Sequence, residues 1–446
     1  MTKAVTTHCE IHNMRLMREQ RWMRIIPVAL IMYTISYVDR TNISLTLDPT
    51  ISTMMKDLLM DDELKGQAAG IFFIGYLLLQ LPGGYLASHW SARKVISICL
   101  IAWGICAIGC GLVKTFDQFQ IARFFLGIAE SGVFPATTVL LANWFPRSER
   151  ARANAYWNLC QPIAIVASAP VTAALLRHVG WQRTLMLEGA LPFIWLPIWW
   201  FCIRDHPREA KWISREERQF LEQTLKGETV SLEPPKGISL LSRVANPALL
   251  VMIAIYFLHN CAAYGCMTFL TSNFGGKEFS TAHGILFAIP YAVTALIMIL
   301  NSWHSDKTHE RRWHVAGIYA LSGTSLILSV LLRGHFWVSY GFICLAIPGP
   351  FAAMAPFWAV PSETLPRAGL GLVVGLVNAF GNLGGYVGPK VAGWLIKLYG
   401  NTSVSFTVLG IGTLLAAGFA LLLPKSPKIP QLSPTPSLAE QSAAQR

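Results

Sequence analysis

Twelve apolar stretches divide the sequence, each about as long as a bilayer's hydrocarbon core is thick. Because that core is roughly 30 Å thick, a helix needs about 20 apolar residues to cross it. The polar segment 204–246 separates the first six stretches from the last six. The stretches cover, approximately, residues 25–47, 67–87, 95–113, 119–141, 153–175, 184–203, 247–270, 281–300, 314–332, 337–357, 369–391 and 403–423. The sequence therefore predicts an all-α, polytopic membrane protein with twelve transmembrane helices in two six-helix halves.

The composition excludes an ordinary soluble protein of this length. Hydrophobic residues make up 53% of the 446, charged residues only 13%, and the mean hydropathy is +0.45. The net charge of +12 comes mainly from Lys and Arg in the short segments between apolar stretches, so it does not indicate nucleic-acid binding. Most of the nine cysteines lie inside apolar stretches, where they are typical of small hydrophobic side chains. We expect no cofactor, no metal and no nucleic-acid partner.

The distribution of basic residues predicts the orientation in the membrane. Arg93, Lys94 and Arg311 lie in connections on one side, whereas Lys56 and Lys65 on the other side are balanced by acids. The positive-inside rule then places both termini in the cytoplasm. The expected divisions are a cytoplasmic tail (1–24), the first half (25–203), a cytoplasmic linker (204–246), the second half (247–424) and a disordered cytoplasmic tail (425–446).

The first apolar stretch carries two formal charges, Asp39 and Arg40. Ionised side chains at membrane depth cost several kcal/mol unless they are paired or face a polar cavity. Helical spacing puts four polar side chains on one face: Tyr33, Tyr37, Arg40 and Ser44. We expect Arg40 to face a cavity and Asp39, about 100° round the helix, to meet a neighbouring helix or the cavity's edge. A structural ion pair is the alternative.

The fourth stretch carries Arg123 and Glu130, seven residues apart on one helix face. Two helical turns separate them by roughly 10.5 Å, so they cannot pair directly. Asp39 is the candidate partner for Arg123. Glu130 lies near mid-membrane, where removal from water favours the neutral acid and suits the group to carrying a proton. A further acid, Glu188 in the sixth stretch, is expected to form a structural pair with the nearby arginines.

The two halves repeat weakly at an offset near 220 residues, as Asn158 aligns with Asn378. Two parallel six-helix halves are typical of a major facilitator transporter, whose binding site lies between the halves. The sequence resembles the major facilitator superfamily and, within it, the anion:cation symporter family over nearly the whole chain. Four segments carry the resemblance: Tyr37-Val38-Asp39-Arg40-Thr41-Asn42-Ile43, residues 123–135, residues 143–153, and residues 381–389.

The resemblance implies roles for particular side chains. Asp39 and Glu130 match the family's proton-coupling acids, and Arg40 matches the arginine that binds the substrate anion. Chemistry also favours Arg40, because a guanidinium binds a carboxylate with two parallel hydrogen bonds and stays charged when desolvated. Five further positions match sugar-acid contacts of related transporters: Tyr37, Tyr76, Gln161, Trp358 and Asn378.

The superfamily's cytoplasmic gating motif occurs in both halves. The second copy has Asp306 with Arg311 and Arg312, where acid and bases can clamp neighbouring helices. The first copy keeps Arg93 and Lys94 but has Ser88 where the motif has Asp, which leaves its gating ion pair without the usual acid.

Together these features predict a monomeric secondary active transporter of the bacterial inner or plasma membrane. It would take up a small organic anion with protons by alternating access. Sugar acids, aromatic carboxylates, small dicarboxylates and sulfonates all fit an Arg40 site. An organic-anion exchanger or exporter is the alternative within transport. A membrane-embedded enzyme is disfavoured because His-Glu-x-x-His and Gly-x-Ser-x-Gly motifs are absent from the sequence.

Overall fold

The computed structural model describes residues 2–230, 247–273, 283–364 and 370–424. Every regular element in these ranges is helical, which confirms the predicted all-α class. The first half contains α1 (Thr2–Thr46), α2 (Met54–Asp57), α3 (Asp62–Leu78), α4 (Gln80–Leu86), η1 (Ala87–Ser91), α5 (Ala92–Cys110), α6 (Phe116–Ser131), α7 (Val133–Trp144), α8 (Arg147–Asn158), α9 (Cys160–Gly189) and α10 (Leu191–Cys202).

The segment after the first half contains η2 (Pro207–Glu209) and α11 (Arg215–Val230). The second half follows with α13 (Pro247–Phe269), η3 (Thr271–Asn273), α14 (His283–Thr308), α15 (Arg312–Leu331), α16 (Phe336–Ala346), α17 (Pro348–Ala352), α18 (Met354–Thr364), α19 (Leu370–Asn382), α20 (Gly384–Tyr399) and α21 (Thr402–Ala420).

Several predicted spans are built from more than one helix. The second span consists of α3 and α4, and the eleventh of α19 and α20. Conversely, α9 includes a sharp turn at Gly180, where φ is +79°, a value that glycine adopts without a side-chain clash. Within the described residues, eight continuous helical stretches are long and apolar enough to cross a membrane, and Arg152–Cys202 contains two predicted spans.

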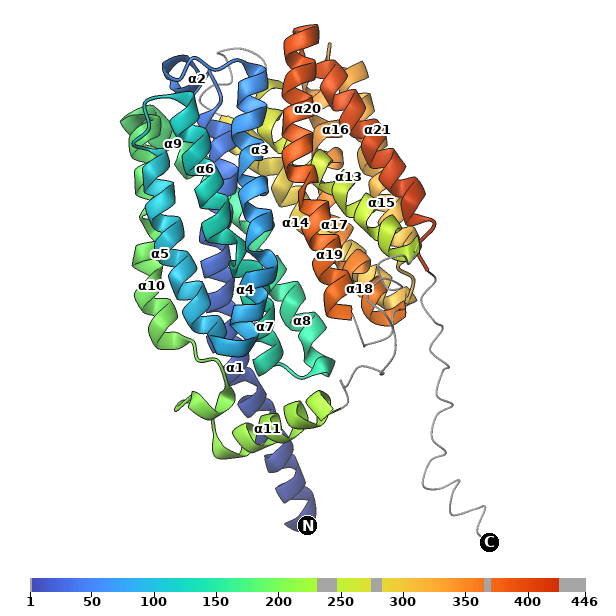
Figure 1. The fold of residues 1–446 in the computed structure, drawn as a ribbon. Helices are drawn as coiled ribbons and strands as arrows, with labels where there is room; N and C mark the ends of the chain where they lie inside the picture. Colours follow the sequence, from blue (N-terminus) through green and yellow to red (C-terminus); the bar gives the residue numbers. More distant parts are fainter. Residues whose placement is uncertain (1, 231–246, 274–282, 365–369, 425–446) are drawn as a thin grey trace.

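The two halves lie side by side (Figure 1). α11 lies at the end of the molecule where α1 begins, which we call the linker end; α2 lies at the opposite end. α3 packs on α20 and α9 on α14, so both pairs join the two halves. A Cβ atom at Gly66 of α3 would lie 2.2 Å from the carbonyl oxygen of Pro389 in α20. The backbones of the two halves are thus in direct contact near the opposite end.

Charged side chains also join the halves there. Lys397, in the last turn of α20, pairs with Asp61 at 3.0 Å and with Glu63 at 2.8 Å, at the start of α3.

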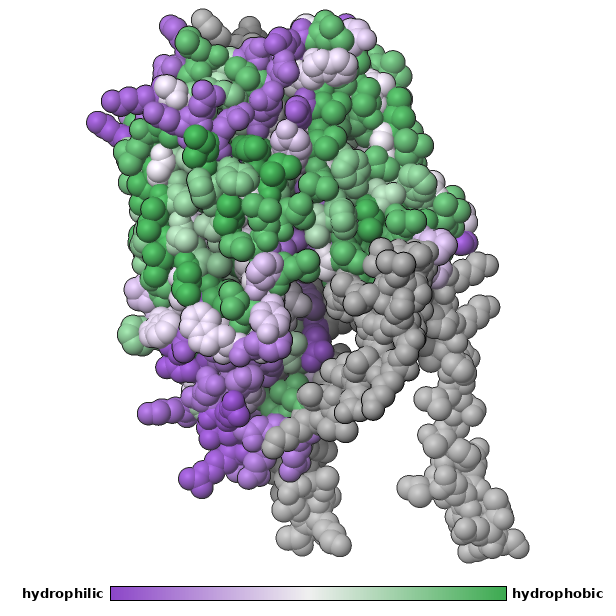
Figure 2. Space-filling view, in the orientation of Figure 1, coloured by the Kyte–Doolittle hydropathy of each residue, from purple (hydrophilic) through white to green (hydrophobic). Residues whose placement is uncertain are grey.

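Around the middle of the molecule the visible surface is an apolar band with hydrophilic side chains at both ends (Figure 2). Exposed side chains such as Ile105, Ile121 and Ile194 belong to this apolar exterior, as expected for contact with lipid.

Candidate functional site

Arg40 lies in an aromatic cage inside the bundle, with 5% of the residue exposed. Tyr37 and Arg40 share the α1 face that the spacing predicted, and Tyr76 of α3 faces them. The guanidinium carbon is 5.0 Å from the ring centre of Tyr37 and 4.8 Å from that of Tyr76. Tyr33 and Phe72 complete the cage at 5.7 and 5.3 Å. Such ring faces stabilise a buried cation by roughly 0.5–2 kcal/mol.

Glu130 of α6 pairs with Arg40. The Nε and Nη2 groups of Arg40 donate to Glu130 Oε2 at 3.2 and 3.0 Å, and Ser36 Oγ donates to the same oxygen at 2.8 Å. Glu130 is fully buried, and its other oxygen, Oε1, has no hydrogen-bond partner among the described residues. The guanidinium that the sequence assigned to a substrate anion therefore holds a carboxylate of the chain itself.

Arg123 contacts Asp39 through the backbone instead of the side chain. Arg123 Nη1 donates to the Asp39 carbonyl oxygen at 3.1 Å. The Asp39 carboxylate points toward α5, where it accepts a hydrogen bond from Trp103 Nε1, and Asn42 Nδ2 lies 3.5 Å from its Oδ1. The expected carboxylate–guanidinium pair is replaced because the Asp39 side chain leaves α1 toward α5, whereas Arg123 reaches α1 from α6.

The second half contributes Tyr264 of α13 to the cage. Tyr264 adjoins the side chains of Tyr37 and Arg40, and its ring centre is 4.2 Å from that of Phe73. A small cavity between the halves, with space for about one water molecule, is lined by Arg40, Ile43, Ala69, Phe72, Phe73, Arg123, Tyr264, Met267, Thr268 and Pro389. Tyr256, Asn260 and Tyr264 are spaced four residues apart and form a polar stripe on α13, and Tyr264 is the member that reaches Arg40.

The other three expected substrate contacts lie outside the cage. Asn378 of α19 donates to Gln80 Oε1 of α4 at 3.1 Å, a bond between the two halves. Trp358 packs on Tyr256, with ring centres 5.2 Å apart. Gln161 donates to Asn158 Oδ1 at 3.2 Å. Within the described ranges, none of these three side chains is hydrogen-bonded to Arg40.

The first copy of the motif, which runs from η1 into α5, is bound by an acid from elsewhere in the chain. Asp205, just after α10, accepts hydrogen bonds from the Arg93 backbone N–H at 2.9 Å and from Ser91 Oγ at 2.5 Å. The Arg93 guanidinium lies 3.9 Å from the ring centre of Trp200, and Lys94 Nζ lies 5.2 Å from that of Trp90. Ser88 instead bonds locally to the carbonyl oxygen of Tyr85.

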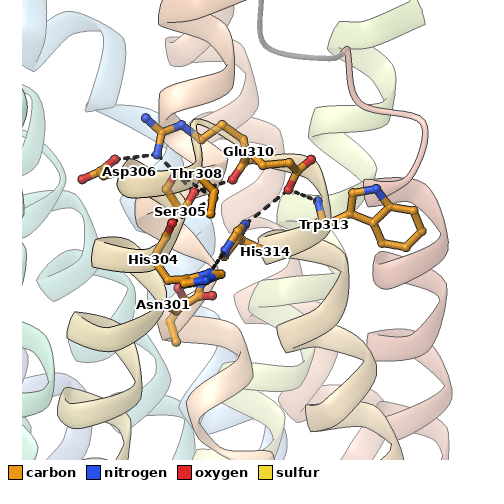
Figure 3. Close-up of polar contacts among 10 residues, drawn as sticks. Asn301, His304, Ser305, Asp306, Thr308, Glu310, Trp313 and His314 are labelled. Atoms are coloured by element: carbon orange, nitrogen blue, oxygen red, sulfur yellow. Dashed lines mark hydrogen bonds and ion pairs between the residues drawn. The ribbon is translucent and has the colours of Figure 1, made fainter. Parts of the chain in front are cut away.

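The second copy of the motif, between α14 and α15, contains a compact polar network (Figure 3). Arg311 pairs with Asp306 at 2.5 Å and also donates to Ser305 Oγ at 3.1 Å. Arg312 Nη1 reaches the carbonyl oxygen of Leu421, beyond the end of α21, at 3.1 Å. The basic residues of this loop thus connect it within itself and to the last helix of the same half.

His304 and His314 form the other part of this network. His304 Nδ1 and His314 Nε2 are 2.6 Å apart, and His314 Nδ1 is 3.2 Å from Glu310 Oε2 (Figure 3). Glu310 Oε2 also accepts the backbone N–H of Trp313 at 2.8 Å. The carboxylate therefore satisfies an amide in the first turn of α15 and orients the histidine pair.

The sequence is similar to those of known membrane transporters. A family model described as Major Facilitator Superfamily matches residues 29–389. A putative tartrate transporter of Agrobacterium vitis is 30% identical over 413 residues, covering 90% of each chain. A quinolone resistance transporter of Acinetobacter baumannii is 29% identical over 404 residues, covering 87% of this chain and 90% of that protein.

Solved structures show the same architecture. A partially occluded, inward-open conformation of the xylose transporter XylE from E. coli superposes with a TM-score of 0.69 at 15% identity. The match covers 90% of this chain and 98% of that one. At this identity the likeness concerns the fold alone, and it confirms the predicted arrangement of two helical halves.

Proposed function

Since this chain belongs to the Major Facilitator Superfamily of membrane transporters, we propose that it takes up a small organic anion together with protons by alternating access. Its relatives and its fold are those of multi-pass membrane transporters, so the chain is not an enzyme. The proposed transporter works as a monomer in a bacterial inner membrane with both termini and the linker end in the cytoplasm. The basic loops after α4 and α14 support that orientation.

The observation that carries this proposal is the buried Arg40–Glu130 pair. A substrate carboxylate that approaches the Nε–Nη2 edge of Arg40 needs the two donors that Glu130 Oε2 occupies at 3.2 and 3.0 Å. A proton on Glu130 removes its negative charge and weakens its hold on the guanidinium, which then becomes available to the substrate. The unpartnered Oε1 is the oxygen that receives this proton, while Ser36 continues to bond Oε2.

This exchange keeps the buried charge nearly constant. A buried guanidinium without an anion costs several kcal/mol, so either Glu130 or the substrate must balance Arg40. Protons also offset the membrane potential, which opposes entry of an anion by about 2.3 kcal/mol per charge per 100 mV. Asp39, buried beside Trp103, is the second proposed proton carrier.

The chemistry of the cage supports a small hydroxy acid as substrate. The rings of Tyr33, Tyr37 and Tyr76 lie against the Arg40 guanidinium, and Tyr264 adjoins it. These four residues carry hydroxyl groups of the kind that a hydroxylated carboxylate needs for hydrogen bonds. Tartrate, the compound named for the Agrobacterium vitis relative, has two carboxylates and two hydroxyls. Because the cavity holds about one water, the halves must separate before such an anion enters.

The remaining sequence-predicted residues have proposed roles in that movement. Gln161, Trp358 and Asn378 line the widened site, Asn378 after releasing Gln80. Lys397 with Asp61 and Glu63 holds the opposite end closed. Arg93, Lys94, Asp306, Arg311 and Arg312 stiffen the loops at the linker end, where they close the other gate.

An aromatic anion is the second candidate substrate, and it implies export or exchange. The rings of the cage suit stacking, and the Acinetobacter baumannii relative is named a quinolone resistance transporter.

Liposomes enclosing a pH-sensitive dye separate the candidates when tartrate, glucarate, benzoate or a quinolone is added outside. We expect tartrate or glucarate to acidify the lumen with wild type but not with Arg40→Ala. Labelled tartrate that exchanges without moving protons would contradict symport.

A further inference from the structure

A third buried carboxylate, Glu188, lies near the site but outside the Arg40 cage. Glu188 follows the turn at Gly180 and is 6% exposed. Its Oε1 accepts a hydrogen bond from Thr172 Oγ at 2.5 Å and its Oε2 accepts one from Asn42 Nδ2 at 2.8 Å. The nearby arginines expected to pair with it, Arg177 and Arg183, are exposed at the surface. Glu188 is therefore a buried acid with neutral partners.

Asn42 places Glu188 next to Asp39. The Nδ2 group of Asn42 donates to Glu188 and lies 3.5 Å from Asp39 Oδ1, so one amide stands between two carboxylates. Asp39 is 3% exposed, and the donor to its other oxygen is the neutral indole of Trp103. Neither carboxylate is ion-paired with a basic side chain in the described part of the chain.

The surrounding elements supply too few positive charges for two ionised acids. Arg40 on α1 is paired with Glu130, and Arg123 on α6 bonds the Asp39 backbone. α5 contributes the thiols Cys106 and Cys110 beside Trp103. α10, and residues 284–293 of α14, contain no acidic or basic residue. Three buried carboxylates thus share two buried guanidiniums.

We propose that Asp39 and Glu188 share one proton, which makes Glu188 a further proton-carrying residue of this transporter. Two ionised carboxylates this close, in a low-dielectric interior without a paired cation, are strongly disfavoured, whereas one proton leaves a single charge for Asn42, Trp103 and Thr172 to stabilise. Thr172 suits both states, because its hydroxyl donates to a carboxylate and accepts from a carboxylic acid. At any one time the proton forms an O–H bond with Asp39 or with Glu188, and the other carboxyl group stays ionised.

This inference deepens the proposed function and rests on it for its role in transport. With one proton on Glu130 and one on the Asp39–Glu188 pair, the cycle moves two protons per anion. A dianion such as tartrate would then cross without net charge. The pair lies within α1 and α9 of the first half, so the halves can separate without breaking it. In the proposed cycle, water that enters the separated site stabilises the second negative charge and allows the proton to leave.

Infrared difference spectroscopy of the purified full-length protein tests the shared proton without any substrate. We expect wild type near neutral pH to show a carboxylic acid C=O band that Glu188→Gln and Asp39→Asn each abolish. The double variant should lose no more than either single variant, because one proton is shared. Asp117→Asn, an exposed acid at the start of α6, is the control and should leave the band unchanged. A band that persists in Glu188→Gln would overturn the proposal, as would two separate, additive losses.

Transport supplies the second readout. In liposomes, Glu188→Gln should still exchange labelled tartrate for unlabelled tartrate but should move one proton fewer per anion under a pH gradient. Preserved exchange shows that the variant is folded. If wild type moves no anion, the proposed function fails while the infrared result still decides the shared proton. Unchanged proton stoichiometry in an exchange-competent Glu188→Gln would overturn the role of Glu188 in coupling.

Discussion

Arg40 and Glu130 meet at 3.0 Å in the interior of the bundle, although they are 90 residues apart and belong to different helices. The pair occupies the position where a substrate anion and a proton would compete for the two partners. In the proposed cycle, binding of the anion to Arg40 and binding of the proton to Glu130 are therefore two parts of one exchange.

Arg40→Lys tests the geometry of the anion site while it keeps the charge. A lysine ammonium is a point charge and cannot present the two parallel donors of a guanidinium. Loss of one charge-assisted hydrogen bond costs about 1.5–3 kcal/mol, so tartrate binding should weaken by roughly 10- to 100-fold. Binding measured by titration calorimetry, with Lys114→Arg at the exposed start of α6 as control, checks this. If Arg40→Lys binds tartrate as tightly as wild type, the anion does not bind at Arg40.

Lys397→Gln tests closure at the opposite end. This exposed lysine joins α20 to Asp61 and Glu63 at the start of α3. Two contacts lower the pKa of Asp61: the hydrogen bond from the Leu64 backbone amide and the interaction with Lys397. The contact is thus fully present above the ordinary pKa of Asp61 and is lost as pH falls through its lowered value. At neutral pH the variant should label faster at a cysteine that replaces Ala69, which lines the cavity between the halves, and high salt should abolish the difference. Equal labelling rates at low salt would argue against this gate.

Glu217→Gln tests how α11 docks on the first half. Burial raises the pKa of Glu217, although Arg21, 3.7 Å away, opposes that rise. A raised pKa in the docked state means that docking is most stable below the ordinary glutamate pKa and weakens as pH rises through the raised value. Proteolysis within α11 should therefore accelerate with pH in wild type and vary less in Glu217→Gln. The same pH response in both proteins would exclude Glu217 as its source.

The sequence predicted each helix face better than the contacts between helices. Hydrophobic length placed the spans, and the spacing of Tyr37 and Arg40 placed them on one face, because both follow from the geometry of a single helix. The Arg40–Glu130 pair depends on the rotation of α6 relative to α1, which no spacing within one helix encodes. For the same reason the sequence does not show that Trp103 binds the Asp39 carboxylate while Arg123 binds the Asp39 backbone. Nor does it identify Asp205 as the acid that takes the place of the one missing at Ser88.

Tyr264 shows that contacts between the two halves are also difficult to predict from the sequence. It belongs to the second half and reaches the cage only because α13 packs near α1 at the interface between the halves. The polar stripe on α13 offered three equivalent candidates, and only the depth at which the halves meet selects one. Likewise, Asn378 was expected at the substrate and instead bonds Gln80 in this closed arrangement, because the two halves are in contact there.

The affinity for tartrate between about pH 6 and 8, where tartrate itself remains ionised, tests directly whether Glu130 competes with the anion for Arg40. Wild type should bind more weakly as pH rises, because ionised Glu130 then competes for Arg40. Glu130→Gln should bind more tightly than wild type at pH 8 and should lose most of the pH dependence, whereas the exposed control Asp117→Asn should behave as wild type. If Glu130→Gln binds no more tightly than wild type at pH 8, Glu130 does not compete with the anion for Arg40.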